Sequence, residues 1–200
     1  MAVLSTYIIS GRATHGLRGL SRAFSVVFAP LVFIQMAWMA HAEIPKEYQV
    51  KAVFLFNFTQ FIEWPTNAFP DAQSPMTIGV LGDDPFGNFL EETVRGEKAN
   101  GRPIIVKHFQ SVENLGNCQI LYVSTSEAKR MKTTLAALKG RKILAVSDLV
   151  EFAQNGGAVR FVTEKNKIHF RINLEAAKKA GLTISSKLLR LAEIVEPGKD

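Results

Sequence analysis

The sequence predicts a single α/β domain of three layers, with a mostly parallel sheet, an antiparallel hairpin at the sheet edge and a signal peptide in front. Short apolar runs alternate with amphipathic stretches from Met76 to about Gln154, as in a parallel sheet covered by helices on both faces. Two runs of alternating polarity follow, separated by three polar residues, which is typical of a hairpin. The first 42 residues contain no acidic residue and end in an apolar stretch.

That first stretch has the parts of an export signal. Three arginines precede an uncharged run over residues 23–40, and Ala40-His41-Ala42 then offers small residues at a cleavage position. An uncleaved membrane anchor is the alternative, because 18 uncharged residues approach the length that spans a bilayer. Pro30 and Gln35 interrupt the run, however. We therefore predict a signal peptide over residues 1–42 and a mature domain that works outside the cytoplasm.

The mature domain, residues 43–200, has a length that suits one core. Loss of the three leader arginines lowers the formal net charge from +6 to +3. A mild excess without a basic run gives no reason to expect a nucleic acid partner. Cys118 is the only cysteine, which excludes an intramolecular disulfide. Because it opens an apolar run, we expect a buried and inert thiol.

The first element of the mature domain is a helix from Lys46 to Trp64, which Pro65 stops. Its apolar stripe is wider than one face, so the helix is either deeply buried or presented to a partner. In the second case it offers a self-complementary patch suited to a two-fold homodimer. That patch would consist of Phe54, Phe58 and Phe61.

The elements of the sheet follow a loop over residues 65–75. Apolar runs rich in Val and Ile predict the strands, and apolar residues at helical spacing predict the helices between them. The predicted strands are Met76 to Leu81, Pro103 to Phe109, Gln119 to Ser124 and Ile143 to Ser147, and the predicted helices are Phe86 to Val94, Ser126 to Leu138 and a short one near Leu149 to Gln154.

The pattern then changes to a hairpin. Ala158 to Thr163 and Lys167 to Ile172 alternate in polarity, and we place them as antiparallel strands at the sheet edge. Asn173 caps a helix that runs through Ala180, and a last amphipathic helix covers Ser186 to about Val195. On the last strand, Arg171 and Asn173 are expected to share one face with His169, where they could recognise a partner or simply face solvent.

A candidate ligand site lies where the first and third predicted strands end. Asp83 and Asp84 follow the first strand, and Ser124 ends the third, the position at which doubly wound folds place their binding loops. The loop lacks the glycine pattern and the lysine of a phosphate cradle. Capping of the following helix by either carboxylate is the alternative explanation, since a cap needs only one of them.

The sequence contains none of the catalytic motifs G-x-S-x-G, H-E-x-x-H and C-x-x-C. The mature domain has two histidines, His108 and His169, and neither has ligands nearby at metal-binding spacing. Asp148 follows a strand in a catalytic position, but it also fits a normal helix start. We therefore expect no enzyme activity, no metal and no cofactor.

Several stretches of the sequence resemble the YfiR-like family of bacterial periplasmic proteins. The opening signature runs from Tyr48 to Phe58 and ends in Phe61-Ile62-Glu63-Trp64-Pro65. Matching blocks follow in order over nearly the whole mature chain. They are Ile78 to Gly87, Gly101-Arg102-Pro103, Cys118 to Val123, Val146-Ser147-Asp148, Phe152 with Gly156-Gly157, and Phe170 to Leu174 with Ile184 to Leu189.

The resemblance implies a non-enzymatic negative regulator in the periplasm. Such proteins are dimers that bind the sensor region of an inner-membrane diguanylate cyclase and hold it inactive, which lowers cyclic-di-GMP and biofilm formation. An OmpA-like outer-membrane lipoprotein can sequester them. For this chain we place the partner contacts at Phe152, Arg171, Asn173 and the last helix. With Cys118 alone, redox control through an internal disulfide, as in relatives with several cysteines, is not expected.

The alternative is a periplasmic small-molecule binding module that reports to another membrane receptor. It would use the strand ends near Asp83, Asp84 and Ser124. A ligand that binds the native state raises its apparent stability, so the two hypotheses differ in what a thermal-shift screen should find.

Overall fold

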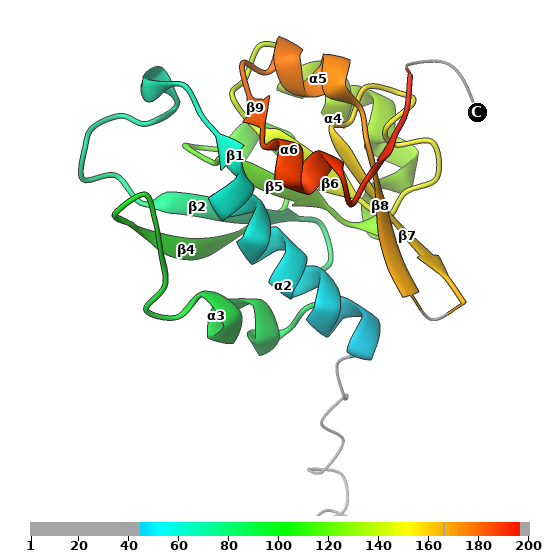
Figure 1. Cartoon of the computed structure of the whole chain (residues 1–200), viewed down its shortest axis with the longest axis horizontal. Helices are drawn as coiled ribbons and strands as arrows, with labels where there is room; N and C mark the ends of the chain where they lie inside the picture. The colour runs from blue at the N-terminus through cyan, green and yellow to red at the C-terminus, as the bar shows by residue number, and fades with distance from the viewer. Residues whose placement is uncertain (1–44, 166, 197–200) are drawn as a thin grey trace, which may run out of the picture. The chain divides into compact units, whose positions relative to one another are not determined.

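A mostly parallel sheet organises the part of the chain that the computed structural model describes, residues 45–165 and 167–196 (Figure 1). Its eight strands lie in the order β10-β8-β7-β6-β5-β2-β4-β3. A separate two-stranded sheet pairs β1 with β9. The predicted signal peptide, residues 1–42, lies outside the described residues. None of the described helices is long and apolar enough to cross a membrane.

The helices and strands follow the order that the alternating sequence pattern predicts. The strands are β1 (Ile62–Glu63), β2 (Met76–Leu81), β3 (Lys98–Ala99), β4 (Arg102–Phe109), β5 (Ile120–Val123), β6 (Leu144–Ser147), β7 (Val159–Glu164), β8 (Lys167–Ile172), β9 (Thr183–Ile184) and β10 (Glu193–Ile194). The helices are α2 (Lys46–Phe61), α3 (Asn88–Val94), α4 (Met131–Leu138), α5 (Leu174–Lys179) and α6 (Ser186–Leu189), with short 3-10 turns η1 (Thr66–Ala68), η2 (Val112–Asn114) and η3 (Thr125–Arg130).

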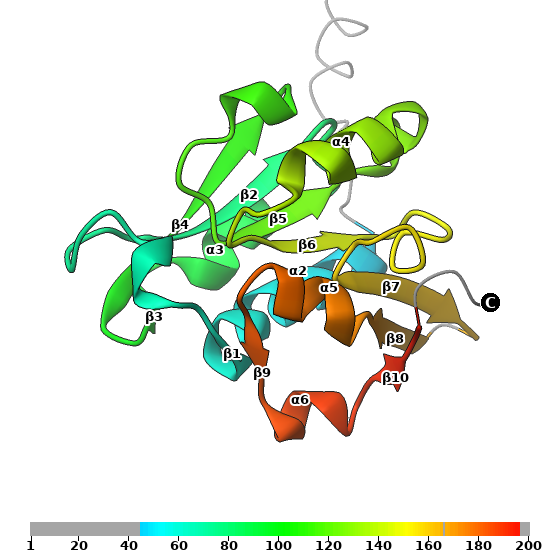
Figure 2. The same ribbon diagram turned by 90° about the horizontal axis from the view of Figure 1, so that it is seen from above.

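The central strands are apolar throughout because both of their faces are covered. Every residue of β2, β5 and β6 is buried. Along β5, Ile120 and Tyr122 belong to the core under α2 and α3, whereas Leu121 and Val123 belong to the core under α4. Alternate side chains of a strand point to opposite faces, so these two cores lie on opposite sides of the sheet. Figure 2 shows α4 on one side of the sheet and α2 on the other. The predicted three-layer α/β fold is confirmed.

Helix α2 packs its aromatic side chains onto the hairpin. Phe58 is fully buried and stacks on Phe161 of β7, with 5.9 Å between ring centroids. Phe54 meets Phe170 of β8 edge to face at 5.4 Å. The predicted homodimer patch therefore loses Phe58 to the core, while Phe54 and Phe61 are only partly buried. The dimer itself stays a prediction.

Several elements differ from those expected from sequence. The last helix, expected from Ser186 to about Val195, ends at Leu189, because Glu193 and Ile194 form β10 beside β8. The helix expected from Ser126 starts at Met131, after the 3-10 turn η3. The first helix ends at Phe61 instead of Trp64, because Ile62 and Glu63 pair with β9. The short helix expected near Leu149 to Gln154 is a run of turns. Glu151 there has a φ of 59°, which lies outside the right-handed helical region and interrupts any helix.

The antiparallel hairpin of β7 and β8 is confirmed, with Phe161 opposite Phe170. It is not quite at the sheet edge, however. The short strand β10 pairs with the end of β8, setting Glu193 beside Arg171 and Ile194 beside Ile172. The outer edge of β8 is thus covered in this sheet only over its last two residues.

Candidate functional site

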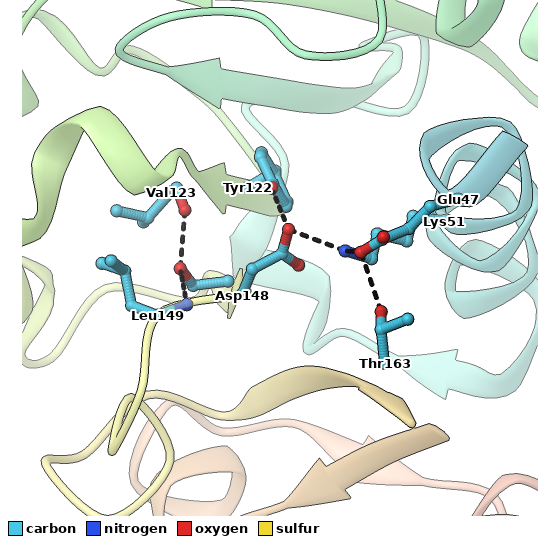
Figure 3. A network of polar contacts seen from close by, with 8 residues as sticks. Glu47, Lys51, Tyr122, Val123, Asp148, Leu149 and Thr163 are labelled. Atoms are coloured by element: carbon cyan, nitrogen blue, oxygen red, sulfur yellow. Dashed lines mark hydrogen bonds and ion pairs between the residues drawn. The ribbon is translucent and has the colours of Figure 1, made fainter. Parts of the chain in front are cut away.

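A partly buried polar network lies at the carboxyl ends of β5 and β6, where binding sites of parallel sheets are commonly placed (Figure 3). We call Glu47, Lys51, Tyr122, Asp148 and Thr163 the carboxyl-end network. Lys51 Nζ lies 2.8 Å from Asp148 Oδ2, and the Tyr122 hydroxyl donates to the same oxygen at 2.9 Å. Lys51 also pairs with Glu47, whose carboxylate accepts from Thr163 Oγ1 at 2.8 Å.

Local structure fixes each member of this network. Tyr122 belongs to β5 and points toward α2, because it lies on the same face as Ile120. Asp148 sits in the turn after β6, and the Ser147 hydroxyl holds that turn. It donates to the carbonyl oxygen of Val123 at 2.6 Å and accepts from the amide of Leu149 at 3.1 Å. The Ser147 hydroxyl thus links the end of β5 to the turn that carries Asp148.

Two charges of the network are largely removed from water, whereas the side chain of Glu47 is 38% exposed. The side chain of Lys51 is 2% exposed and that of Asp148 12% exposed. Removing such charges from water is costly, and a close opposite charge with further hydrogen bonds offsets that cost. Lys51 Nζ also lies 4.6 Å from the centre of the Tyr48 ring, a favourable position over an aromatic face. Lys51 is thus held by two carboxylates and one ring.

These surroundings shift the proton affinities of the neighbouring acids. Burial and the negative charge of Asp148 raise the pKa of Tyr48 to about 12 and raise the pKa of Tyr122 well above its usual value. Burial alone would raise the pKa of Glu47, but hydrogen bonds from Lys51 and Thr163 outweigh it and hold that pKa below its usual value. Both phenols therefore stay protonated at neutral pH, and Tyr122 can act as the donor to Asp148.

The network connects α2 to three strands of the sheet or to their ends. It joins the first turns of α2 to the ends of β5 and β6 through Asp148, and to β7 through Thr163. Asp148 Oδ1 is buried and accepts no hydrogen bond from the described residues. A change at any of these strand ends would consequently alter the anchoring of α2.

Sequence reasoning considered Asp148 and missed Lys51. The signal that could have found it is a lone lysine between Val50 and Ala52 in a helix that is otherwise nearly apolar. Lysine is rarely buried unless it is paired, so a lysine on that stripe calls for an acidic partner.

The predicted ligand residues lie at the ends of β2 and β5. Asp84 Oδ1 accepts from the amide of Phe86 at 2.8 Å, and Ser126 Oγ accepts from the amide of Asp83 at 2.9 Å. Ser124 is 3% exposed and caps η3. Neither aspartate caps α3, since Gly87 holds that position. Asp84 instead stabilises the turn before it, and ligand binding by Asp83, Asp84 and Ser124 stays a prediction.

Asp84 also approaches one of the two histidines. His108 Nε2 on β4 lies 3.3 Å from Asp84 Oδ2 and 3.6 Å from Glu91 Oε1. His169 is exposed on β8, opposite Val162. Across residues 45–165 and 167–196, no three His, Cys, Asp or Glu side chains are grouped in a way that could hold a metal ion.

The predicted partner residues do not share a face. Arg171 is partly exposed and pairs through Nε with Glu193 Oε2 at 2.9 Å. Asn173 is 1% exposed, because it lies beyond the end of β8 and turns inward to cap α5. Its Nδ2 donates to the carbonyl oxygen of Ala153 at 2.7 Å. The expectation that Asn173 stands beside Arg171 on an open face is wrong.

Phe152 is also inside the domain, at 0% exposure. A Cβ atom built on Gly157 would lie 2.2 Å from its ring, so the ring covers a position where only glycine fits. Phe152 and Asn173 thus lie beneath the surface of the domain and are not placed for direct contact with a partner. Of the three residues, Arg171 alone is placed for direct contact, and partner binding through any of them stays a prediction.

Cys118 is 4% exposed, and its Sγ lies close to the carbonyl oxygen of Ile120, at 2.9 Å. Burial raises the pKa of this thiol to about 12. The expected burial of this thiol is confirmed, and its inertness stays a prediction.

Comparison with known proteins gives one family match. A family model described as YfiR/HmsC-like matches residues 48–193. No curated protein matches the chain.

Among solved structures, an ABC domain in complex with L-Trp from Streptococcus pneumoniae has 14% identity and a TM-score of 0.46 over 60% of this chain and 55% of that one. A conserved domain protein from Vibrio cholerae has 12% identity and a TM-score of 0.45 over 59% and 54%. A ligand-free, open substrate-binding protein with adhesive properties from Clostridium difficile has 14% identity and a TM-score of 0.45 over 61% and 55%. The chain thus spans about half the length of each.

Proposed function

The chain belongs to the YfiR/HmsC-like family, and on that premise we propose that it binds the sensor region of an inner-membrane diguanylate cyclase and holds it inactive. At the level of the family, the function is regulation of diguanylate cyclase signalling in the periplasm, and the family is regulatory rather than enzymatic. The observation that carries the proposal is the extent of the match, residues 48–193, which includes almost all described elements.

The repression works as a population shift. A membrane cyclase exchanges between inactive and active states, and a protein that binds the inactive state more tightly displaces the equilibrium toward it. A ten-fold preference corresponds to about 1.4 kcal/mol and lowers the ratio of active to inactive cyclase at most ten-fold. Lower cyclic-di-GMP and weaker biofilm formation follow from that shift. A homodimer as the binding unit and an OmpA-like outer-membrane lipoprotein that sequesters it belong to the same proposal.

We place the contact for the cyclase around Arg171 and the carboxyl-terminal segment. Leu191 is 70% exposed and Ile194 46% exposed, and two such side chains three residues apart can contribute to an interaction surface. Ile194 directly follows Glu193, which pairs with Arg171 between β10 and β8, and Leu191 precedes Glu193 by two residues. Arginine is enriched in binding hot spots, and exposed apolar residues near it add apolar contact area. Figure 2 shows α6 and β10 on the outer side of β8, where a partner has access.

The test is a pull-down of the mature protein with the periplasmic domains of the organism's membrane-bound diguanylate cyclases. We expect one of these domains to be retained, and Leu191→Asp to weaken its retention about ten-fold or more. Val150→Asp is the matched control, because Val150 is 69% exposed. It lies in the turn after β6, which β7 separates from β8 in the sheet.

Retention of none of these domains would contradict the proposed function. Retention that Leu191→Asp and Val150→Asp affect equally would contradict only the proposed contact surface.

A further inference from the structure

A cavity of about 720 Å³ opens between α4, α5 and the turn over residues 154–156. Ile143 and Ala145 line it from the start of β6, and Ala158 from just before β7. The cavity therefore lies at the amino ends of these strands, away from both the carboxyl-end network and the loop of Asp83 and Asp84. Its volume is in the range of pockets that hold small organic molecules.

Small side chains keep this space open. Ala145 and Ala158 form a buried floor, and Ala136 and Ala176 face it from α4 and α5. An alanine side chain ends at Cβ, so these four residues leave the space between the sheet and the two helices unfilled. Leu135 and Leu138, both 8% exposed, add apolar wall. The interior of the cavity thus suits an apolar molecular body.

The rim of the cavity is strongly basic. Four cationic side chains, Lys132, Lys139, Arg141 and Lys179, line it together with a single acid, Glu175. Glu175 already pairs with Lys179. Arg141 is held in place, because its Nη2 donates to the carbonyl oxygens of Leu115 at 2.5 Å and Gly116 at 2.9 Å.

The other two lysines on the rim are available to a ligand. Within residues 45–165 and 167–196, neither Lys132 nor Lys139 forms a salt bridge. The mature chain as a whole has only a mild positive charge, so this concentration of cations is local. It complements an anionic group at the mouth of the cavity.

We propose that this cavity binds a small amphipathic organic anion, with an apolar body between the alanine-lined walls and one acidic group at the lysine rim. The carbonyl groups at the end of α4 disfavour negative charge near Leu138. Lys132 lies in the first turn of α4, far from those carbonyls, so the acidic group is expected near Lys132. The inference is independent of the proposed partner of the protein.

Decanoate is a suitable probe, with decyltrimethylammonium as the same chain carrying the opposite charge. Titration calorimetry of the mature protein below the micellar concentration should detect decanoate binding that weakens with added salt, and at least ten-fold weaker binding of the cation. Ala136→Phe should fill the cavity and weaken decanoate binding about ten-fold or more. Ala137→Phe is the control, since Ala137 is exposed on the same helix but does not line the cavity.

The charge on the rim is tested separately. Lys132→Glu should weaken decanoate binding about five-fold, the effect expected of an exposed ion pair, while Lys129→Glu, outside the cavity, should change it less than two-fold. Circular dichroism confirms that each variant is folded.

Three results would overturn the proposal: equal binding of both probes, decanoate binding that survives Ala136→Phe, or binding to phosphatidylglycerol vesicles in place of free decanoate. The last would mark the lysines as a membrane-binding surface.

Discussion

Replacing Lys51 with methionine should destabilise the domain strongly. The substitution keeps most of the side-chain volume but leaves Asp148 as a largely buried carboxylate that keeps hydrogen bonds from the Tyr122 and Tyr48 hydroxyls and loses its cationic partner. Removing one partner of a buried ion pair typically costs about 3–5 kcal/mol. Asp148 retains 12% exposure, so we expect the lower end, about 3 kcal/mol. For a domain of this length that corresponds to a melting temperature lowered by about 6–12 °C.

Urea denaturation followed by circular dichroism measures this loss. Lys46→Met is the matched control, since Lys46 is exposed at the start of the same helix, and it should change the free energy of unfolding by less than about 0.5 kcal/mol. Combining Lys51→Met with Asp148→Asn removes both charges and should recover about 1–2 kcal/mol relative to the sum of the single effects. A Lys51→Met variant within about 0.5 kcal/mol of the parent protein would show that the network does not brace α2.

Three further predictions concern the protein without any partner. Because the pKa of Tyr48 rises from 10.0 in the unfolded chain to about 12 in the native state, its stabilising contribution is complete below pH 10 and lost between pH 10 and 12. Tyr48→Phe should therefore make the free energy of unfolding less sensitive to pH over that window. An unchanged slope of this free energy against pH would contradict the shift. Cys118 should react with a thiol reagent at pH 8 only as fast as the domain opens, and rapid reaction of the native protein would contradict its burial. Gly157→Ala should destabilise by about 1–3 kcal/mol, because its Cβ meets the Phe152 ring, and the smaller Phe152→Leu should reduce that loss in a double variant.

Residues whose environment follows from local pattern could be predicted from the sequence. The run Ile120-Leu121-Tyr122-Val123 is apolar at every position, which indicates a strand covered on both faces, and the structure divides it between the two cores. The hairpin of β7 and β8 also follows from its alternation. In each case the pattern of apolar residues along a strand follows from which faces of the sheet are covered.

Residues whose role depends on distant contacts could not be predicted in this way. Asn173 continues the alternation of β8, but the strand ends at Ile172 and the amide caps α5. Lys51 has its partner 97 residues away in the chain. The cavity at the amino ends of β6 and β7 depends on alanines from four different segments meeting in space. Nothing in the local sequence around any one of them indicates such a meeting.

The most direct test of the regulatory function measures cyclic-di-GMP synthesis by the membrane-bound cyclases when the mature protein is added to their periplasmic side. The account predicts that the rate of at least one cyclase falls with increasing protein, to a saturating level, and that Leu191→Asp shifts this dependence to higher concentration while Val150→Asp does not. Rates that stay unchanged for every cyclase at saturating protein would contradict it.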